Sequence, residues 1–336
     1  MDSLTHIALG ACIGEAFFEK KIGKKALLWG ALAQSIPDID FLASFWLSTS
    51  ENLLAHRGFT HSILFALLIV PVFAVVADRL HRPHDTNFKK WSLFFAAEVF
   101  MHLFLDAFNN YGIGWLEPFS HQRFSFNVIY VADPFFSIWP GIAILMLLIL
   151  RRTNKQRVFW WKFGIFLPLI YLIYCTMNKV SINQEVKEMI AKQNIPNERY
   201  FTTPTPLNNW LWFVVTGNDS GYYVGFRSVF DTKKNMQFEY FPRNDTLLKT
   251  MSDHEEVQQL ITFSQQFYVV EKWKDTVIFN DLRFGQILGW QHPKEKFVFH
   301  YFLQHPQYNK LVIQRGRFHG WNKQEVINLL KRIRGN

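Results

Sequence analysis

Long apolar runs dominate the first half of the chain. They occupy residues 4–18, 26–36, 62–77, 91–108, 135–150 and 158–177. The runs at 62–77 and 135–150 carry no charge, the last carries one lysine, and the run at 91–108 holds three ionisable residues. Because a bilayer span needs roughly 20 mostly apolar residues, we expect a membrane α-helical bundle with about four to six transmembrane helices over residues 1–180.

After residue 177 apolar residues alternate with polar ones, which is the pattern of half-buried strands. The expected strands lie at 210–216, 222–230, 236–241, 268–270, 276–280, 284–290, 296–303 and 311–314. The segment GNDSG at 217–221 predicts a hairpin loop, and residues 247–263 and 323–333 have helical spacing. Residues 181–336 are therefore predicted to form a soluble α+β domain.

The distribution of charge predicts the orientation in the membrane. Lys and Arg number 36 against 27 Asp and Glu, a formal net charge of +9, although only 19% of residues are charged. Twelve basic residues form three clusters between consecutive apolar runs: Lys20, Lys21, Lys24 and Lys25; Arg79, Arg82, Lys89 and Lys90; Arg151, Arg152, Lys155 and Arg157. The positive-inside rule makes these loops cytoplasmic, and places 37–61, 109–134 and the C-terminal domain outside. Basic residues in short loops also disfavour a nucleic-acid partner.

Two further features limit the class of protein. The 2 cysteines exclude a disulfide framework and a cysteine-rich zinc module. The first apolar run has an acidic residue near its start and no basic residue before it, so a signal peptide is not expected.

Four polar clusters lie in or beside the apolar half. In the first, Asp2 and His6 are four residues apart and share one face of a starting helix. The commoner use of such an aspartate is as an N-cap, and this remains the alternative. In the second, Asp38 and Asp40 follow a proline, and their hard oxygen donors can bind one cation or straddle two. The alternative there is a solvated turn.

The third cluster, HRGFTHS at 56–62, opens the apolar run at 62–77. His56 and His61 flank a turn in which Gly58 allows close backbone approach, so both rings can converge on a metal ion. The planar guanidinium of Arg57 suits a phosphate oxygen. An interfacial loop of amphipathic residues is the alternative, which this density of histidine and arginine disfavours.

The fourth cluster lies inside the apolar run at 91–108. Glu98, His102 and Asp106 follow one another at intervals of four and share one helical face. An ionisable residue in a membrane helix costs roughly 2.5–3.5 kcal/mol on insertion scales, so the first interpretation is a functional site facing the bundle interior. A structural network of ion pairs or hydrogen bonds is the alternative.

All four clusters reach the same predicted side of the membrane, opposite the basic loops. They gather His6, His56, His61, His102, Asp2, Asp38, Asp40 and Asp106. Neutral imidazole and carboxylate are the usual ligands of catalytic zinc, and so many ligands suffice for more than one ion. The sequence therefore predicts a divalent metal cofactor, with zinc favoured and one or two ions bound.

Other histidines show no such pattern. His81 and His84 lie in a predicted cytoplasmic loop, and those of the C-terminal domain are scattered without ligand spacing. His121 and Asp133 lie in predicted outward loops, where we expect them to border a substrate pocket.

These motifs, in this order, resemble the YdjM-like family of membrane-bound metal-dependent hydrolases. The matching pieces are DSLTH at 2–6, PDID at 37–40, HRGFTHS at 56–62, HLFLD at 102–106 and, more loosely, LEPFS at 116–120. The resemblance covers about residues 1–180 and implies a hydrolase of the bacterial inner membrane.

The family is also distantly similar to the zinc-dependent phospholipase C and P1-type nuclease group, helical enzymes with clustered His and Asp ligands. That similarity implies metal ligands at His6, Asp38, His56, His61, His102 and Asp106. Enzymes of that group also use a free N-terminal amine and a tryptophan. This chain begins Met-Asp, so that feature is not expected here.

The leading hypothesis is a membrane-bound hydrolase acting on a phosphoester or lipid-like substrate at the outer face of the cytoplasmic membrane. Asp38 or Asp40 would serve as general base or bridging ligand, and Arg57 would hold an anionic group. The expected partners are membrane lipid and a small-molecule or lipid substrate; no oligomeric state is predicted. The alternative is a non-catalytic metal-binding membrane protein whose C-terminal domain recognises a partner. Transport is disfavoured because three of the apolar runs hold almost no polar groups.

Overall fold

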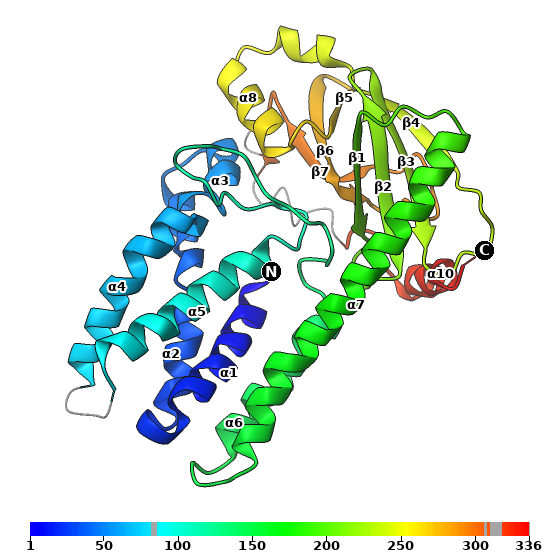
Figure 1. The fold of residues 1–336 in the computed structure, drawn as a ribbon. Helices are drawn as coiled ribbons and strands as arrows, with labels where there is room; N and C mark the ends of the chain where they lie inside the picture. The colour runs from blue at the N-terminus through cyan, green and yellow to red at the C-terminus, as the bar shows by residue number, and fades with distance from the viewer. Residues whose placement is uncertain (82–85, 306–307, 310–317, 336) are drawn as a thin grey trace. The chain divides into compact units, whose positions relative to one another are not determined.

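The computed structural model describes residues 1–81, 86–305, 308–309 and 318–335, with the backbone alone at 19 and 20. The chain divides into two compact units. The helical unit comprises Met1–Phe45, Ala55–Phe126 and Val131–Tyr174, and the second unit comprises Trp46–Leu54, Asn127–Tyr130 and Cys175–Asn336. Figure 1 shows helices first along the chain, in blue to green, and strands after them.

Each of the six apolar runs forms a helix, as the sequence predicts. The helices are α1 (Ser3–Ile22), α2 (Lys25–Gln34), α4 (Ile63–Leu80), α5 (Phe88–Asp106), α6 (Pro134–Ile149) and α7 (Arg157–Lys192). Four of them begin at a side-chain cap: Asp2, Ser62, Asn87 and Asp133 accept a backbone N–H from the first turn. Asp2 is therefore an N-cap, which was the alternative for that residue. α7 runs without interruption through the predicted domain boundary at 180.

Three short helices lie between α2 and α4. They are η1 (Pro37–Phe45), α3 (Thr49–Ala55) and η2 (Phe59–His61), of which η1 and η2 are 3₁₀ helices. Pro37 suits the start of η1 because its fixed φ matches a first helical turn. The tight winding of η1 and η2 turns Asp38 and His61 toward α5.

Glycines bring α1 and α2 into close contact. A Cβ added at Gly30 would lie 1.9 Å from the Gly10 carbonyl oxygen, and one at Gly14 would lie 2.1 Å from the Ala26 carbonyl oxygen. Only glycine permits this approach of two backbones. This contact holds the C-terminal end of α2 beside the polar N-terminal end of α1.

An aromatic core fixes the rotation of α5. Phe18 of α1 packs on Trp91 with ring centroids 4.3 Å apart, and Phe94 and Phe95 are buried beside them. Glu98, His102 and Asp106 follow this core along α5 and are also buried. Their common face points into the helical unit, as the four-residue spacing predicts.

Two helices of the described chain, α4 and α7, are long and apolar enough to cross a bilayer. α1 and α6 contain shorter apolar stretches, Ser3–Phe18 and Pro134–Ile149. α2 has 10 residues. A helix of that length rises about 15 Å, which is about half of a ~30 Å hydrocarbon core.

Described members of the three basic clusters meet at one end of the helical unit. Arg152 donates to the Lys21 carbonyl at 3.3 Å, and the Lys24 amine bonds to the Leu148 carbonyl. Lys90 lies 5.0 Å from the centre of the Phe18 ring. Arg82 and His84 lie outside the described residues. The opposite end of α5 carries the polar cluster.

The second unit contains two antiparallel sheets. The first has the order β1 (Arg199–Pro204), β2 (Leu211–Asn218), β3 (Gly221–Ser228), β4 (Phe238–Pro242); the second has the order β5 (Tyr268–Trp273), β6 (Thr276–Gln286), β7 (Phe297–Phe302). Phe213 of the first sheet and Leu282 of the second share one buried core. The remaining elements are η3 (Asp245–Thr250), α8 (His254–Phe263) and α10 (Lys323–Ile333).

Several sequence predictions in this unit are wrong in detail. The strand predicted at 284–290 is not a separate strand, because its first three residues end β6 at Gln286 and a loop follows. The helix predicted at 247–263 is divided, because Asp253 caps a new helix and accepts from Glu256 N. β1 was not predicted, since its polar sequence RYFTTP lacks a clear alternation. The hairpin loop is tighter than expected, with Asn218 paired to Gly221. The strand predicted at 311–314 lies outside the described residues.

Candidate metal centre

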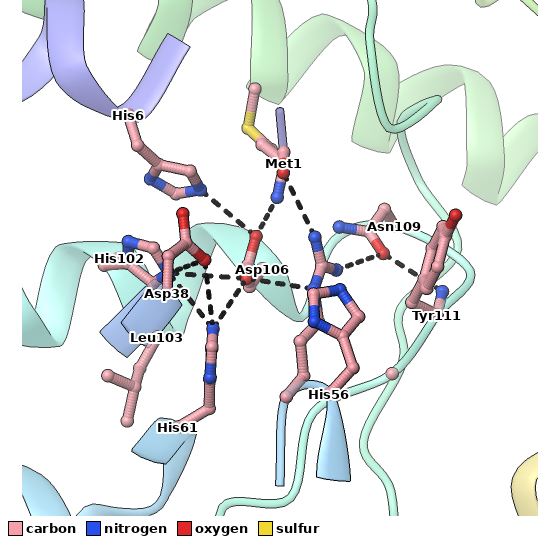
Figure 2. A network of polar contacts seen from close by, with 12 residues as sticks. Met1, His6, Asp38, His56, His61, His102, Leu103, Asp106, Asn109 and Tyr111 are labelled. Carbon is pink, nitrogen blue, oxygen red and sulfur yellow. Dashed lines mark hydrogen bonds and ion pairs between the residues drawn. The ribbon is translucent and has the colours of Figure 1, made fainter. Parts of the chain in front are cut away.

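Four side chains from three separate segments converge in the helical unit (Figure 2). Asp38 belongs to η1, His61 ends η2, and His102 and Asp106 lie one turn apart on α5. One ring nitrogen or carboxylate oxygen of each lies within 4.8 Å of the others. The first of these side chains is 22% exposed and the other three are buried, so the group reaches the surface at Asp38.

Five of the six distances among the four inward atoms are those of a tetrahedral metal site. His61 Nε2 and His102 Nε2 lie 3.2 Å apart, and each lies 3.5 Å from Asp38 Oδ1. Asp106 Oδ2 lies 3.4 and 3.5 Å from the same two nitrogens. Ligand bonds of about 2.0–2.2 Å to a tetrahedral zinc ion separate the ligand atoms by about 3.3–3.6 Å. The group therefore has the size of a first-row divalent cation site.

The outer contact of His102 fixes where the proton of that ring lies, whereas His61 Nδ1 faces both the Thr60 hydroxyl at 3.1 Å and an Asp40 oxygen. His102 Nδ1 is 2.6 Å from the Gln34 backbone carbonyl, which can only accept, so Nδ1 donates and Nε2 presents a lone pair. His61 Nδ1 lies 3.5 Å from Asp40 Oδ2. Burial lowers the pKa of His61 to about 3, so this ring is neutral at neutral pH.

When Nε2 of both rings is unprotonated, all four inward atoms are electron-pair donors. Two imidazole lone pairs and two carboxylate oxygens at 3.2–3.5 Å repel one another unless a cation lies between them. Nitrogen and oxygen donors of this kind suit zinc and its neighbours in the first transition row. The residues present thus fit a divalent metal ion.

Asp40 lies immediately behind this group. Its Oδ2 accepts from the backbone N–H of Arg57 at 2.7 Å and lies 3.3 Å from His56 Nδ1. Burial opposes ionisation, but the hydrogen bonds from His56 and from the Arg57 backbone hold the pKa of Asp40 below its ordinary value. An ionised carboxylate behind a ligand histidine orients the ring and strengthens its lone pair. The structure places Asp40 in this supporting position with respect to His61.

His56 stands apart from the four atoms. Its side chain is 38% exposed, and its ring centroid lies 6.5 Å from that of His61. Its described polar partner is Asp40, so the two form a carboxylate–imidazole pair at the surface of the site.

His6 adjoins the group from α1. Its ring stacks on His102 with centroids 3.9 Å apart, and its Nε2 lies 3.1 Å from Asp106 Oδ1. The N-terminal amine of Met1 contacts the same oxygen. Asp106 therefore directs one oxygen to the four-atom group and the other to His6 and the amine (Figure 2).

The position of the amine corrects an expectation from the sequence. No N-terminal amine was expected in the site, because the chain begins Met-Asp. The hydrogen bond from Asp2 N to the Val131 carbonyl, 3.0 Å long, anchors the residue after Met1 at the start of α1. This contact between distant segments has no signal in the local sequence.

Comparison with known proteins agrees with the motifs. The model of the family described as YdjM inner membrane protein matches residues 1–182. The chain belongs to the YdjM inner membrane protein family. This match confirms the resemblance drawn from the four motifs, and all four residues of the metal group lie within it.

Two relatives extend the comparison. The inner membrane protein YbcI of Escherichia coli is 35% identical over 170 residues, which is 47% of this chain and 96% of YbcI. The uncharacterized protein YfhP of Bacillus subtilis is 29% identical over 308 residues, 84% of this chain and 87% of that protein. No solved structure matches the chain. The match to YfhP is long enough to include much of the second unit, whereas the match to YbcI covers nearly all of YbcI and is about as long as the family region.

Within this YdjM-family site, Arg57 is enclosed. The residue is 3% exposed, has a left-handed φ of 58°, and places Nε 3.2 Å from Asp106 Oδ2. Its other nitrogens donate to Asn109 Oδ1 at 2.8 Å and to the Met1 carbonyl at 3.1 Å. The guanidinium lies 5.0 Å from the Tyr111 ring centre. Arg57 thus holds the carboxylate of Asp106 and the chain start in place.

Asn109 and Tyr111 were missed by the sequence analysis. Asn109 Oδ1 accepts from both Arg57 Nη1 and the Tyr111 backbone N–H, at 2.8 and 3.0 Å. The available signal in the sequence was that both residues follow closely after the HLFLD motif at 102–106. Two other predicted residues lie elsewhere: His121 contacts Glu117 at 2.9 Å with a side chain 76% exposed, and Asp133 caps α6.

Proposed function

We propose that this YdjM-family chain is a membrane-bound hydrolase that uses one or two divalent ions, with zinc favoured. The observation that carries the proposal is a set of four metal-ligating atoms, on Asp38, His61, His102 and Asp106, in which each histidine nitrogen lies 3.2–3.5 Å from the other three atoms. A metal bound there supplies Lewis-acid polarisation of a phosphoryl or carbonyl oxygen and a bound water of lowered pKa.

A second ion has a candidate place beside the first. His6 Nε2, Asp106 Oδ1 and the Met1 amine face one another, and a carboxylate with one oxygen in each group can bridge two ions. Arg57 lies against Asp106 Oδ2, on the side of the first group.

The residues around the four ligand atoms have different proposed roles. Asp40 is enclosed by His56, His61 and a backbone N–H, so it orients these rings rather than meeting substrate. His56 is the exposed member of that pair and can carry a proton to or from a reacting group. Arg57 is too enclosed to meet a substrate anion, so we assign it the positioning of Asp106 in place of the anion-holding role.

The surroundings of Asp38 favour a lipid-like phosphoester as substrate. η1 bears its acidic side chains on the metal side, whereas Ile39, Phe41 and Phe45 are 43%, 61% and 77% exposed. Apolar side chains exposed beside a polar site suit the boundary of a bilayer. The basic clusters gather at the other end of the helices, so the positive-inside rule puts the site at the outer face of the cytoplasmic membrane and the C-terminal domain outside. In this topology α1, α4, α5, α6 and α7 cross the membrane, and the shorter α2 returns the chain to the outer face, where η1 begins.

One observation favours the non-catalytic alternative. Four protein ligands complete a tetrahedron, and structural zinc sites are closed in this way, whereas catalytic sites keep one position for water. In that case the metal stabilises the helical unit and the C-terminal domain recognises a partner. The exposure of Asp38 distinguishes the two, because a ligand at the surface can yield its position to substrate or water.

The test is hydrolysis by the purified, zinc-loaded full chain. The substrates are bis(p-nitrophenyl) phosphate, p-nitrophenyl butyrate and a short-chain phosphatidylcholine. We expect phosphodiester cleavage that falls at least about 100-fold in His102→Ala and is retained in His121→Ala. His56→Ala should lower kcat while metal content stays constant. A zinc-loaded wild type without activity on any substrate supports the non-catalytic alternative, and activity unchanged in His102→Ala contradicts the proposed site.

A further inference from the structure

Glu98 belongs to the polar face of α5, but the metal centre described above gives it no role. The residue lies one turn before His102 and is fully buried. Neither oxygen of its carboxyl has a hydrogen-bond partner among the described residues. A buried carboxyl in a membrane helix is costly, and such residues face the bundle interior, where a partner group satisfies them. The carboxyl of Glu98 therefore needs a donor close by.

The side-chain amide of Gln34 supplies donors of the right kind. Gln34 ends α2, is fully buried, and places its polar side chain beside the Glu98 carboxyl. Its Nε2 also has no hydrogen-bond partner within the described part of the chain. An amide nitrogen carries two N–H donors, and a carboxylate has two acceptor oxygens. The two unpaired groups are therefore complementary when the amide turns its nitrogen toward Glu98.

The other end of the same amide contacts His6. Gln34 Oε1 lies 3.2 Å from His6 Nδ1. An amide oxygen can only accept, so in this contact Nδ1 of the ring carries the proton and Nε2 presents a lone pair. That nitrogen faces Asp106 Oδ1 at 3.1 Å, beside the Met1 amine (Figure 2). The ring is thus in the form that binds a cation through Nε2.

A reversed amide would put the ring in the opposite form. With Gln34 Nε2 turned toward His6, the amide donates to Nδ1, and the proton of the ring moves to Nε2, where it points at Asp106. A protonated Nε2 cannot bind a metal ion. The amide oxygen would then face the carboxyl oxygens of Glu98, acceptor against acceptor. The acceptors on Glu98 therefore disfavour the reversed amide.

The second ring beside Gln34 does not depend on this choice. His102 Nδ1 donates to the backbone carbonyl of Gln34 at 2.6 Å, and that carbonyl keeps its place whichever way the side-chain amide is turned. An effect of Glu98 that passes through the amide is therefore confined to His6. A general loosening of the helices would disturb both rings.

We propose that Glu98 is a positioning residue of the metal centre, which accepts from Gln34 Nε2 and thereby holds His6 in the form that binds the second ion. The inference rests on the proposed function, because the place of the second ion is part of it. Glu98 itself touches neither metal nor substrate in this arrangement. Its carboxyl acts on His6 through one intervening amide.

The test is the position of the His6 proton in the zinc-free full chain at pH 8. Long-range ¹H–¹⁵N NMR of protein labelled with ¹⁵N-histidine reports it, and the His6 signals are those missing in His6→Gln. We expect the Nδ1–H form in the wild type and in Glu98→Gln, because glutamine keeps an acceptor oxygen. Glu98→Met has no acceptor, so Asp106 then favours a proton on Nε2. The ratio of the two forms should shift toward Nε2–H by at least about tenfold.

Two further variants separate this role from a loss of structure. Gln34→Met removes the intervening amide and should give the same shift, so it replaces Glu98→Met if that variant does not fold. Glu15→Met is the matched control, because Glu15 is a buried glutamate of the helical unit that pairs with Arg157 instead. It should leave the His6 signals unchanged, and His102 should keep its proton on Nδ1 in every variant.

Zinc titration of the same proteins gives a second readout. We expect the affinity for the second ion to fall about 10- to 100-fold in Glu98→Met and to be retained in Glu98→Gln. A wild type with the proton of His6 on Nε2, or a Glu98→Met variant with the wild-type tautomer ratio, overturns the role of Glu98. A wild type that binds no zinc contradicts the proposed function, whereas the NMR result in zinc-free protein still supports or overturns the role of Glu98.

Discussion

His61 Nε2 and His102 Nε2 lie 3.2 Å apart inside the helical unit, and each ring has a hydrogen-bond acceptor on its far side. When Nε2 of both rings is unprotonated, the two rings direct lone pairs at each other. A carboxylate oxygen of Asp38 from η1 and one of Asp106 from α5 complete the group. The arrangement is stable with a cation inside it and costly without one.

The first prediction concerns removal of the metal. Chelation leaves the four donor atoms facing one another, and a metal that binds only the folded chain adds to its stability. We expect EDTA to lower the Tm of the wild type by several degrees and to leave that of His102→Ala unchanged. Thermal unfolding with and without chelator measures both. An equal effect of EDTA on the two proteins would show that its target is not this group.

The second prediction concerns Asp40. Asp40→Asn removes the charge behind His61 while keeping the size of the side chain, so the ring loses its fixed orientation. Changes to such supporting groups typically weaken metal binding about 10- to 100-fold. Competition with a fluorescent zinc chelator measures the affinity. Glu117→Gln is the matched control, because Glu117 pairs with the exposed His121 away from the group; an equal loss there would refute a specific role for Asp40.

The third prediction concerns the contact between α1 and α2. Gly30→Ala places a methyl group 1.9 Å from the Gly10 carbonyl oxygen, so the helices must separate. Separation moves Gln34 away from His6 and His102, and both stability and metal content should fall. Gly141→Ala is the control, because a Cβ at Gly141 meets nothing within 4 Å. Measurements of Tm and bound zinc should distinguish the two, and similar behaviour would contradict the close packing.

The fourth prediction concerns pH and Asp133, the residue before α6. Burial raises its pKa to about 6, although Tyr171 and two backbone N–H groups donate to it. Because the folded pKa lies above the unfolded value of about 4, protonation stabilises the fold at low pH, and this contribution is lost as the pH rises through 6.

Asp133→Asn keeps an N-cap oxygen and removes the charge. We therefore expect this variant to be more stable than the wild type at pH 7.5, by up to about 3 kcal/mol, and equally stable at pH 4. Thermal unfolding at the two pH values is the measurement. A difference that does not change with pH would mean that the carboxyl is not the titrating group.

The fold was predictable where a local pattern determines it. Six apolar runs gave six helices, and the four-residue spacing placed His102 and Asp106 on one buried face. Alternation located most strands of the second unit. β1 and the division at Asp253 escaped prediction, because pairing with β2 and a side-chain cap decided them.

The site was less predictable because residues only a few positions apart in the sequence are buried to different extents and play different roles. Asp38 and Asp40 look equivalent in PDID, and the 3₁₀ winding of η1 alone puts one in the group and the other behind it. His56 and His61 look equivalent too, until η2 buries only the second. Arg57 was assigned to substrate from its chemistry, whereas the left-handed backbone at that position turns it inward. Such differences arise from tertiary packing and cannot be predicted from residue spacing.

The most direct test of the central claim is the zinc content of the purified full chain, measured by mass spectrometry in the wild type and in single variants. The account predicts one to two zinc ions per chain in the wild type and in His121→Ala. It predicts loss of at least one ion in Asp38→Asn, His61→Ala, His102→Ala and Asp106→Asn, each with helical content preserved. A wild type that binds no divalent metal after zinc loading, or variants that bind as much as the wild type, would contradict it.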